Sequence, residues 1–224
     1  MSRIVACLVG IACISGAPAA EVSGTITLAK KFRKQVLAPA VYDLRGVAIR
    51  ESAVPDSRRN EFERIAVWLE SDEPATVGPV HAAMEQRDRR MEPGLVIVPT
   101  GSTVDFPNLD PIFHNIFSLS RTQSFDLGYY PQGQSRSVRF QRPGIVQVYC
   151  HVHPNMYGVI VVVSSRWFQK PAPDGTFSLS GVTAGKYRLM LWQKTAGLVS
   201  KSIVVPESGT VRANFSIPDE DPEN

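Results

Sequence analysis

The chain has 224 residues, of which 43% are hydrophobic and 20% charged, and its formal net charge at pH 7 is +3. This length suits one large or two small domains, and the composition is ordinary for a soluble globular protein. Because the positive excess is small and no single element gathers the basic residues, the sequence gives no indication of nucleic-acid binding.

Residues 1–19 have the pattern of a secretory signal peptide. Arg3 supplies the positive start, an apolar stretch runs from Ile4 to about Ile14, and Ala17-Pro18-Ala19 gives a small-x-small cleavage pattern. The stretch is too short to span a bilayer. We therefore expect cleavage near Ala19 and an exported, periplasmic or secreted chain with no transmembrane segment. A buried N-terminal helix is the alternative, which the lack of a polar face disfavours.

Export leaves the mature chain with one thiol. Of the three cysteines, Cys7 and Cys13 lie in the signal segment and only Cys150 remains. A single cysteine cannot form an internal disulfide, and an exposed thiol in an oxidising compartment would oxidise or cross-link. The sequence therefore indicates that Cys150 is either buried or bonded to a metal.

The mature chain is predicted to consist of short strands joined by turns, with no convincing amphipathic helix. An irregular segment over residues 30–64 and a Pro/Gly loop over residues 73–78 interrupt the pattern. Short strands with turns between them imply a β-sandwich or barrel, so the predicted fold class is all-β. The predicted strands cover residues 21–28, 65–69, 95–99, 103–106, 112–119, 135–140, 145–149, 158–163, 176–179, 186–192, 202–205 and 210–217.

The strongest chemical motif is Cys150-His151-Val152-His153-Pro154-Asn155-Met156, which offers thiol, imidazole and thioether groups. Upstream, His114 lies in a predicted strand. Soft sulfur ligands suit Cu(I), imidazole suits both oxidation states, and a His₂Cys site with a weak axial Met is an electron-transfer arrangement. The pattern predicts one copper ion (Cu⁺/Cu²⁺) held by His114, Cys150 and His153, with Met156 as a further ligand.

Each of these residues also has a plainer interpretation. His114 alone would be a structural histidine, and Met156 alone would be core filler. Their combination with the one mature cysteine favours copper. His151 is adjacent to Cys150 and is expected to point away along an extended chain, and His81 is expected to have no role in metal binding.

Residues from about 84 to 164 resemble cupredoxins of the plastocyanin and pseudoazurin type. The resemblance is carried by Val96–Phe106 (VIVPTGSTVDF), His114-Asn115 and Val148–His153 (VYCHVH). It implies a Greek-key β-sandwich with one type 1 (blue) copper bound by His114, Cys150 and His153. It also implies that Asn115 braces the cysteine-containing loop by hydrogen bonds.

The spacing of the axial methionine departs from the plastocyanin pattern. In that family the methionine follows the second histidine by five residues, a position that Gly158 occupies here. Met156 follows His153 by three residues, a spacing that resembles the binuclear purple copper site. That site needs two cysteines, so Met156 is kept as the axial candidate of a mononuclear site.

The flanking blocks resemble a second family. Residues 174–189 (DGTFSLSGVTAGKYRL), together with the predicted strands 22–28 and 65–69, resemble the transthyretin-like regulatory β-sandwich of carboxypeptidases. Hybrids of this kind are often labelled methylamine-utilisation proteins. An N-terminal extension packed on the copper domain is the alternative. The predicted domains are residues 1–19 (signal peptide), 20–80 with 166–217 (discontinuous sandwich), 81–165 (cupredoxin domain) and 218–224 (acidic tail).

Electron transfer between redox partner proteins is the function that these features favour. Copper storage or delivery is one alternative, although the four His and five Met are dispersed. A non-redox binding module with a cupredoxin shell is another. No enzyme activity is expected, because four His cannot build the second cluster of a multicopper oxidase and common hydrolase motifs are missing. Electrons are expected to leave through His153, inside an apolar rim of Pro111, Ile112, Phe113, Pro154 and Tyr157.

Overall fold

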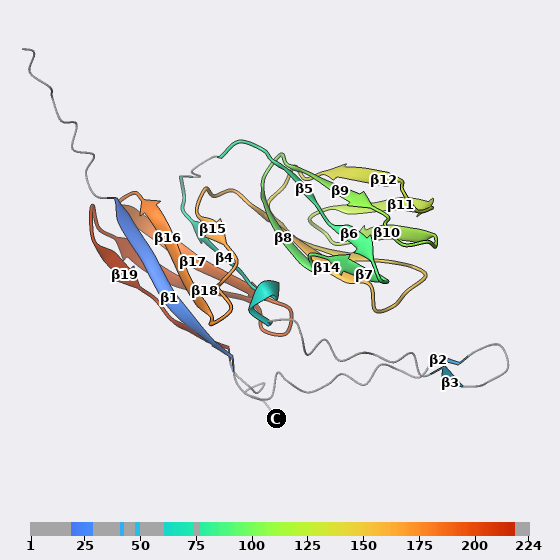
Figure 1. The fold of residues 1–224 in the computed structure, drawn as a ribbon. Helices are drawn as coiled ribbons and strands as arrows, with labels where there is room; N and C mark the ends of the chain where they lie inside the picture. Colours follow the sequence, from blue (N-terminus) through green and yellow to red (C-terminus); the bar gives the residue numbers. More distant parts are fainter. Residues whose placement is uncertain (1–18, 29–40, 43–47, 50–60, 74–76, 218–224) are drawn as a thin grey trace, which may run out of the picture.

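The computed structural model describes residues 19–28, 41–42, 48–49, 61–73 and 77–217. The prediction of an all-β chain is confirmed, because the described residues form strands, turns and one short 3₁₀ helix, η2 (Glu61–Arg64) (Figure 1). Among these residues, no helix is both long enough and apolar enough to cross a membrane. Nearly all of the predicted signal peptide, the acidic tail and most of the segment 30–64 lie outside the described residues. The short strands β2 (Val41–Tyr42) and β3 (Ala48–Ile49) pair with each other.

The central part of the chain folds into two sheets that enclose one core (Figure 1). The larger has the strand order β11-β10-β13-β14-β8 and the smaller β12-β9-β5. Most sheet neighbours are not neighbours in sequence, because the chain crosses between the sheets as a Greek key requires. The strands are β5 (His81–Ala83), β8 (Leu95–Pro99), β9 (Thr103–Pro107), β10 (His114–Leu119), β11 (Ser124–Tyr130), β12 (Ser135–Arg139), β13 (Gly144–Tyr149) and β14 (Tyr157–Val163).

Two further sheets enclose a second core. Their orders are β16-β1-β19, with β20 also on β1, and β15-β4-β17-β18. Strands that precede residue 81 therefore pair with strands that follow residue 166, since β1 pairs with β16 and β4 with β17. The strands are β1 (Ala20–Leu28), β4 (Ala66–Glu70), β15 (Phe168–Gln169), β16 (Thr176–Val182), β17 (Gly185–Gln193), β18 (Gly197–Val205), β19 (Thr210–Arg212) and β20 (Phe215–Ile217).

The two sandwiches share a buried apolar contact, which explains the composition of β14. Ile160 and Val162 on one face of β14 belong to the central core, whereas Val159, Val161 and Val163 on the other face pack against the second sandwich. A strand that is covered on both faces has no solvent-facing positions for polar residues. This is why the run is wholly apolar. The residues contributed by the second sandwich are Ala66, Trp68, Met190 and Trp192.

Four strands of the central region were not predicted. β11 fully buries only its last residue, Tyr130, and contains Gly128, so it lacks a clean alternation of apolar residues. β5, β6 (Glu85–Arg87) and β7 (Arg90–Glu92) are short and mostly polar. The turn between β6 and β7 uses Asp88 and Arg89 at positive φ, without the glycine that normally marks such a hairpin in a sequence. The predicted strand 210–217 is divided into β19 and β20.

A glycine in β1 provides a test of the second sandwich. A Cβ atom at Gly24 would lie 2.0 Å from the carbonyl oxygen of Ala213 and 2.9 Å from the ring of Phe177. We expect Gly24→Ala to lower the free energy of unfolding by about 1–3 kcal/mol, the usual cost of overpacking. Urea denaturation measures this change. Gly78→Ala is the control, because nothing lies within 4 Å of its added Cβ. Equal stability of the two variants would contradict the packing described here.

Candidate metal centre

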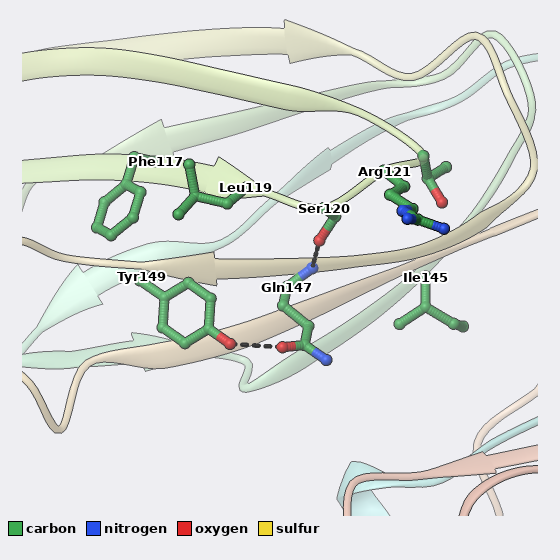
Figure 2. Close-up of a pocket in the computed structure, with 8 residues that line it drawn as sticks. Phe117, Leu119, Ser120, Arg121, Ile145, Gln147 and Tyr149 are labelled. Carbon is green, nitrogen blue, oxygen red and sulfur yellow. Dashed lines mark hydrogen bonds between the residues drawn. The ribbon is translucent and has the colours of Figure 1, made fainter.

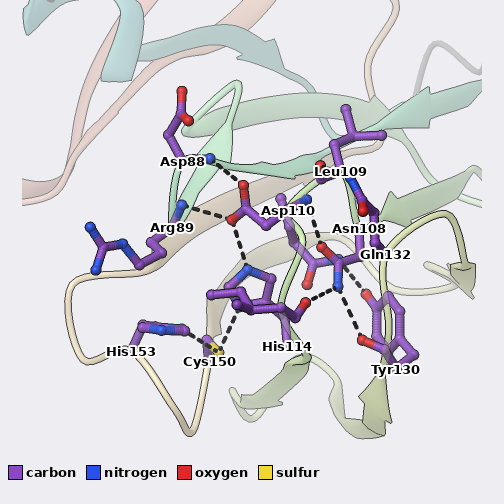
Figure 3. A network of polar contacts seen from close by, with 12 residues as sticks. Asp88, Arg89, Asn108, Leu109, Asp110, His114, Tyr130, Gln132, Cys150 and His153 are labelled. Atoms are coloured by element: carbon purple, nitrogen blue, oxygen red, sulfur yellow. Dashed lines mark hydrogen bonds and ion pairs between the residues drawn. The ribbon is translucent and has the colours of Figure 1, made fainter.

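Three side chains converge at one end of the central sandwich. The ligand atoms of His114, Cys150 and His153 all lie within 4.8 Å of one another, the one such cluster of His, Cys, Asp and Glu donors among the described residues. Cys150 Sγ lies 3.8 Å from His114 Nδ1 and 3.9 Å from His153 Nδ1 (Figure 3). His114 is fully buried, Cys150 is 5% exposed and His153 is half-buried. His81 is exposed on β5, outside this cluster.

The pairing of β13 with β14 determines where the sulfur atoms lie. The antiparallel ladder continues without a shift up to Tyr149 opposite Tyr157. Cys150 follows and Met156 precedes this last pair, and both side chains are buried in the same core cluster. His153 lies midway in the loop, where its carbonyl accepts a hydrogen bond from Met156 N–H at 2.9 Å.

His114 is held from its other side by a buried carboxylate. Its Nε2 lies 2.8 Å from Asp110 Oδ2, and Asp110 is only 6% exposed. Burial raises the pKa of Asp110, but hydrogen bonds from the backbone of Arg89, from His114 and from the backbone of Asp88 outweigh it and lower the pKa below its ordinary value. With Nε2 engaged, Nδ1 is the ring nitrogen that faces Cys150. Asp110 was not predicted, because no motif marks an acidic residue in this loop.

Asn115 contacts the cysteine loop indirectly. Its Nδ2 donates a hydrogen bond of 2.6 Å to Asp126 Oδ1, while its buried Oδ1 has no partner. The other oxygen of Asp126 lies 3.8 Å from Nε2 of His151, the residue after Cys150. His151 also stacks on Phe117, with 3.8 Å between ring centroids. The expected bracing of the loop by Asn115 thus has a structural route through Asp126 and the exposed His151.

Most residues of the predicted apolar rim are exposed. Ile112 is 40% exposed and Phe113 is 59% exposed, and both prolines of the predicted rim are also exposed. Val152, which was not predicted, is 47% exposed in the loop itself. Tyr157 does not belong to this rim, because its ring packs toward the second sandwich, where Lys194 Nζ lies 3.9 Å from the ring centroid. The sequence around Tyr157 does not indicate that the second sandwich covers its ring.

A separate hollow lies on the outer face of the larger sheet (Figure 2). Phe117, Leu119, Gln147 and Tyr149 line it, and the hydroxyl of Tyr149 donates a hydrogen bond to Gln147 Oε1. Successive side chains along a strand point to opposite faces, so Tyr149 faces this hollow while Cys150 faces the core. The hollow therefore lies behind the metal-ligating cluster and contributes no donor to it.

Of the comparisons with known proteins, the one with solved structures found similar chains. No family model and no curated protein matches the sequence. Among solved structures, a purple cupredoxin from Nitrosopumilus maritimus is 23% identical over 37% of this chain and 99% of its own, with a TM-score of 0.34. An amicyanin mutant is 21% identical over 43% and 98%, with a TM-score of 0.36. A Cu-containing nitrite reductase from Thermus scotoductus is 23% identical over 41% of this chain and 25% of its own, also at 0.36.

These similarities are too low to carry functional detail, so the assignment of the site rests on the donor geometry. The comparisons do not support the transthyretin-like resemblance of the flanking blocks, and that assignment stays a prediction.

The tyrosine beneath the site gives the protein a specific response to alkaline pH. Burial raises the pKa of Tyr130 to about 12, and its hydroxyl donates to the Phe106 carbonyl at 2.8 Å and accepts from Gln86 Nε2 at 2.6 Å. An unfolded tyrosine ionises near pH 10. The folded pKa is the higher one, so the contribution of Tyr130 is complete below about pH 10 and is lost as the pH rises toward 12.

We therefore expect the metal-free protein to lose stability between about pH 10 and 12, and Tyr130→Phe to lose less over that interval. Urea denaturation at a series of pH values measures this, with the stability of each protein at pH 8 as its own reference. An identical fall in both proteins would show that Tyr130 does not ionise as its burial requires.

Proposed function

We propose that the chain is an exported type 1 copper protein, periplasmic or secreted, that carries single electrons between redox partner proteins. The observation that supports this is the convergence of Cys150 Sγ with two histidine Nδ1 atoms, 3.8 and 3.9 Å away, at the edge of a β-sandwich. One thiolate and two imidazoles form the donor set of electron-transfer copper sites. When bound, copper supplies one-electron chemistry between Cu(I) and Cu(II).

The chain's own residues prepare this site in three ways. The ligand atoms of His114, Cys150 and His153 lie within 4.8 Å of one another, close enough for a single ion to contact all three. The burial of Cys150 excludes water and other thiols from its sulfur. The burial of Met156 in the same core cluster as Cys150 supports its proposed role as the weak axial donor.

The route to a partner protein is proposed at His153. Its ring is half-buried. Ile112, Phe113 and Val152, which lie within two residues of His114 or His153 in sequence, have exposed apolar side chains. Small apolar surfaces of this kind suit brief redox encounters. We propose a carrier rather than an enzyme, because one thiol and two imidazoles make up the donor cluster, a set typical of electron-transfer copper sites.

The domain arrangement belongs to the same proposal. A cupredoxin domain of residues 81–165 is inserted into a discontinuous transthyretin-like sandwich of residues 20–80 and 166–217. The pairing of β1 with β16 and of β4 with β17 supports this division, since it joins segments on both sides of the copper domain.

The ligand set is tested by the visible and EPR spectra of the mature protein after addition of Cu(II). We expect an intense thiolate-to-copper band that Cys150→Ser abolishes. His151→Ala is the matched control, because this neighbouring histidine is exposed and lies outside the donor cluster. A weak spectrum that Cys150→Ser leaves unchanged would contradict the assignment. Retention of copper through repeated oxidation and reduction separates a carrier from a storage or delivery protein, which would release it.

The role of Met156 is tested by the reduction potential. Met156→Leu removes the thioether while keeping the side-chain volume. A site with one fewer donor and a more apolar lining favours the lower charge of Cu(I). We therefore expect the thiolate band to remain and the midpoint potential to rise. Met91→Leu is the control, since Met91 is an equally buried methionine of the same core. Potentials that are equal in both variants and in the wild type would show that Met156 is core filler.

A further inference from the structure

The buried carboxylate of Asp110 joins the metal-ligating cluster to a hairpin far from it in sequence. Asp110 Oδ2 lies 2.8 Å from Nε2 of His114, and the same oxygen accepts Arg89 N–H at 2.8 Å. The second oxygen, Oδ1, accepts Asp88 N–H at 2.6 Å (Figure 3). Three polar groups from two segments therefore surround one carboxylate.

The turn that binds this carboxylate has an unusual backbone. Asp88 has φ = 53° and Arg89 has φ = 55°, and neither residue is a glycine. The left-handed region is sparsely populated by residues that carry a Cβ. Consecutive N–H groups in turns of this kind can point to one side and form a small anion-binding concavity. The N–H groups of Asp88 and Arg89 both donate to Asp110. These hydrogen bonds give a role to a backbone conformation that is energetically unfavourable for residues with a Cβ.

Asp110 is also fixed from its own loop. Its N–H donates to Asn108 Oδ1 at 3.0 Å. Asn108 Nδ2 in turn donates to the carbonyls of Ile112, at 2.8 Å, and Tyr130, at 3.1 Å. Asn108 is fully buried, so these bonds are shielded from water. The carboxylate is thus held by protein groups from both sides.

We propose that Asp110 is a positioning residue for His114 and that the Asp88–Arg89 turn, which holds it, is a structural part of the metal centre. This inference rests on the proposed copper function. Asp110 accepts the Nε2–H of His114, which leaves Nδ1 as the nitrogen directed at Cys150. A carboxylate partner on the far side of a ligating imidazole fixes the ring's tautomer and orientation and increases its basicity. The stronger donor favours Cu(II) over Cu(I).

One test needs neither copper nor a variant. In the metal-free, ¹⁵N-labelled protein, NMR detects which ring nitrogen of His114 carries a proton. We expect a protonated Nε2 whose proton exchanges slowly with water and resonates downfield because of its bond to the carboxylate. A His114 ring with no proton on Nε2 would overturn the proposal, whatever the protein does with copper.

The second test uses Asp110→Asn in the copper-loaded protein. The amide keeps the shape of the side chain but has one acceptor oxygen in place of two, and it lacks the charge. We expect the thiolate-to-copper band to remain, the affinity for Cu(II) to fall about 10- to 100-fold, as is typical when such partners are removed, and the midpoint potential to rise.

Asp105→Asn is the matched control for the loss of charge. Asp105 lies on β9, and its Oδ1 bonds to the hydroxyl of Ser137 at the surface, away from the donor cluster. If Asp110→Asn gives the potential and Cu(II) affinity of Asp105→Asn, the positioning role is wrong. A wild-type protein without a thiolate-to-copper band would instead refute the proposed function, and the NMR result separates the two failures.

Discussion

The unshifted antiparallel pairing of β13 with β14 is the constraint on which the donor cluster depends. It ends at Tyr149 opposite Tyr157, so the next residues, Cys150 and Met156, emerge on the core side. A slip of one residue would turn both sulfur atoms to the opposite face of the sheet. The second sandwich opposes such a slip, because it packs on the outward valines of β14 while the inward residues fill the central core. The second sandwich thereby helps to maintain the register of β14, on which the donor cluster depends.

The site has two supports of different origin. The hairpin loop holds Cys150 and His153 by local geometry, three residues apart in sequence. His114 comes from a strand 36 residues earlier and needs a separate support, which Asp110 and the Asp88–Arg89 turn provide. Both supports form from protein groups alone. Together they bring one thiol and two imidazoles close to one another, and the proposed electron transfer requires these ligands to stay in place in both oxidation states of copper.

The sequence allowed the parts of this structure that depend on local patterns to be predicted. β-Branched runs marked β14, and the seven-residue motif from Cys150 to Met156 marked the ligand loop. Features set by contacts between distant segments were not predictable. Asp110 shows no motif, and the turn that binds it lacks a glycine. The prediction that Tyr157 belongs to the rim was wrong. Residues of β4 and β17, which are far from Tyr157 in sequence, cover its ring. Asn115 was expected at the loop, but its partner Asp126 lies on β11, an exposed strand that the pattern did not reveal.

The most direct test of the central claim is X-ray absorption at the copper edge of the copper-loaded mature protein, which reports the atoms bound to the metal. A nearest shell of one sulfur and two nitrogen atoms is the predicted result, with the sulfur lost in Cys150→Ser. A shell of nitrogen and oxygen atoms alone in the wild-type protein would contradict it, and the convergence of His114, Cys150 and His153 would then have no part in copper binding.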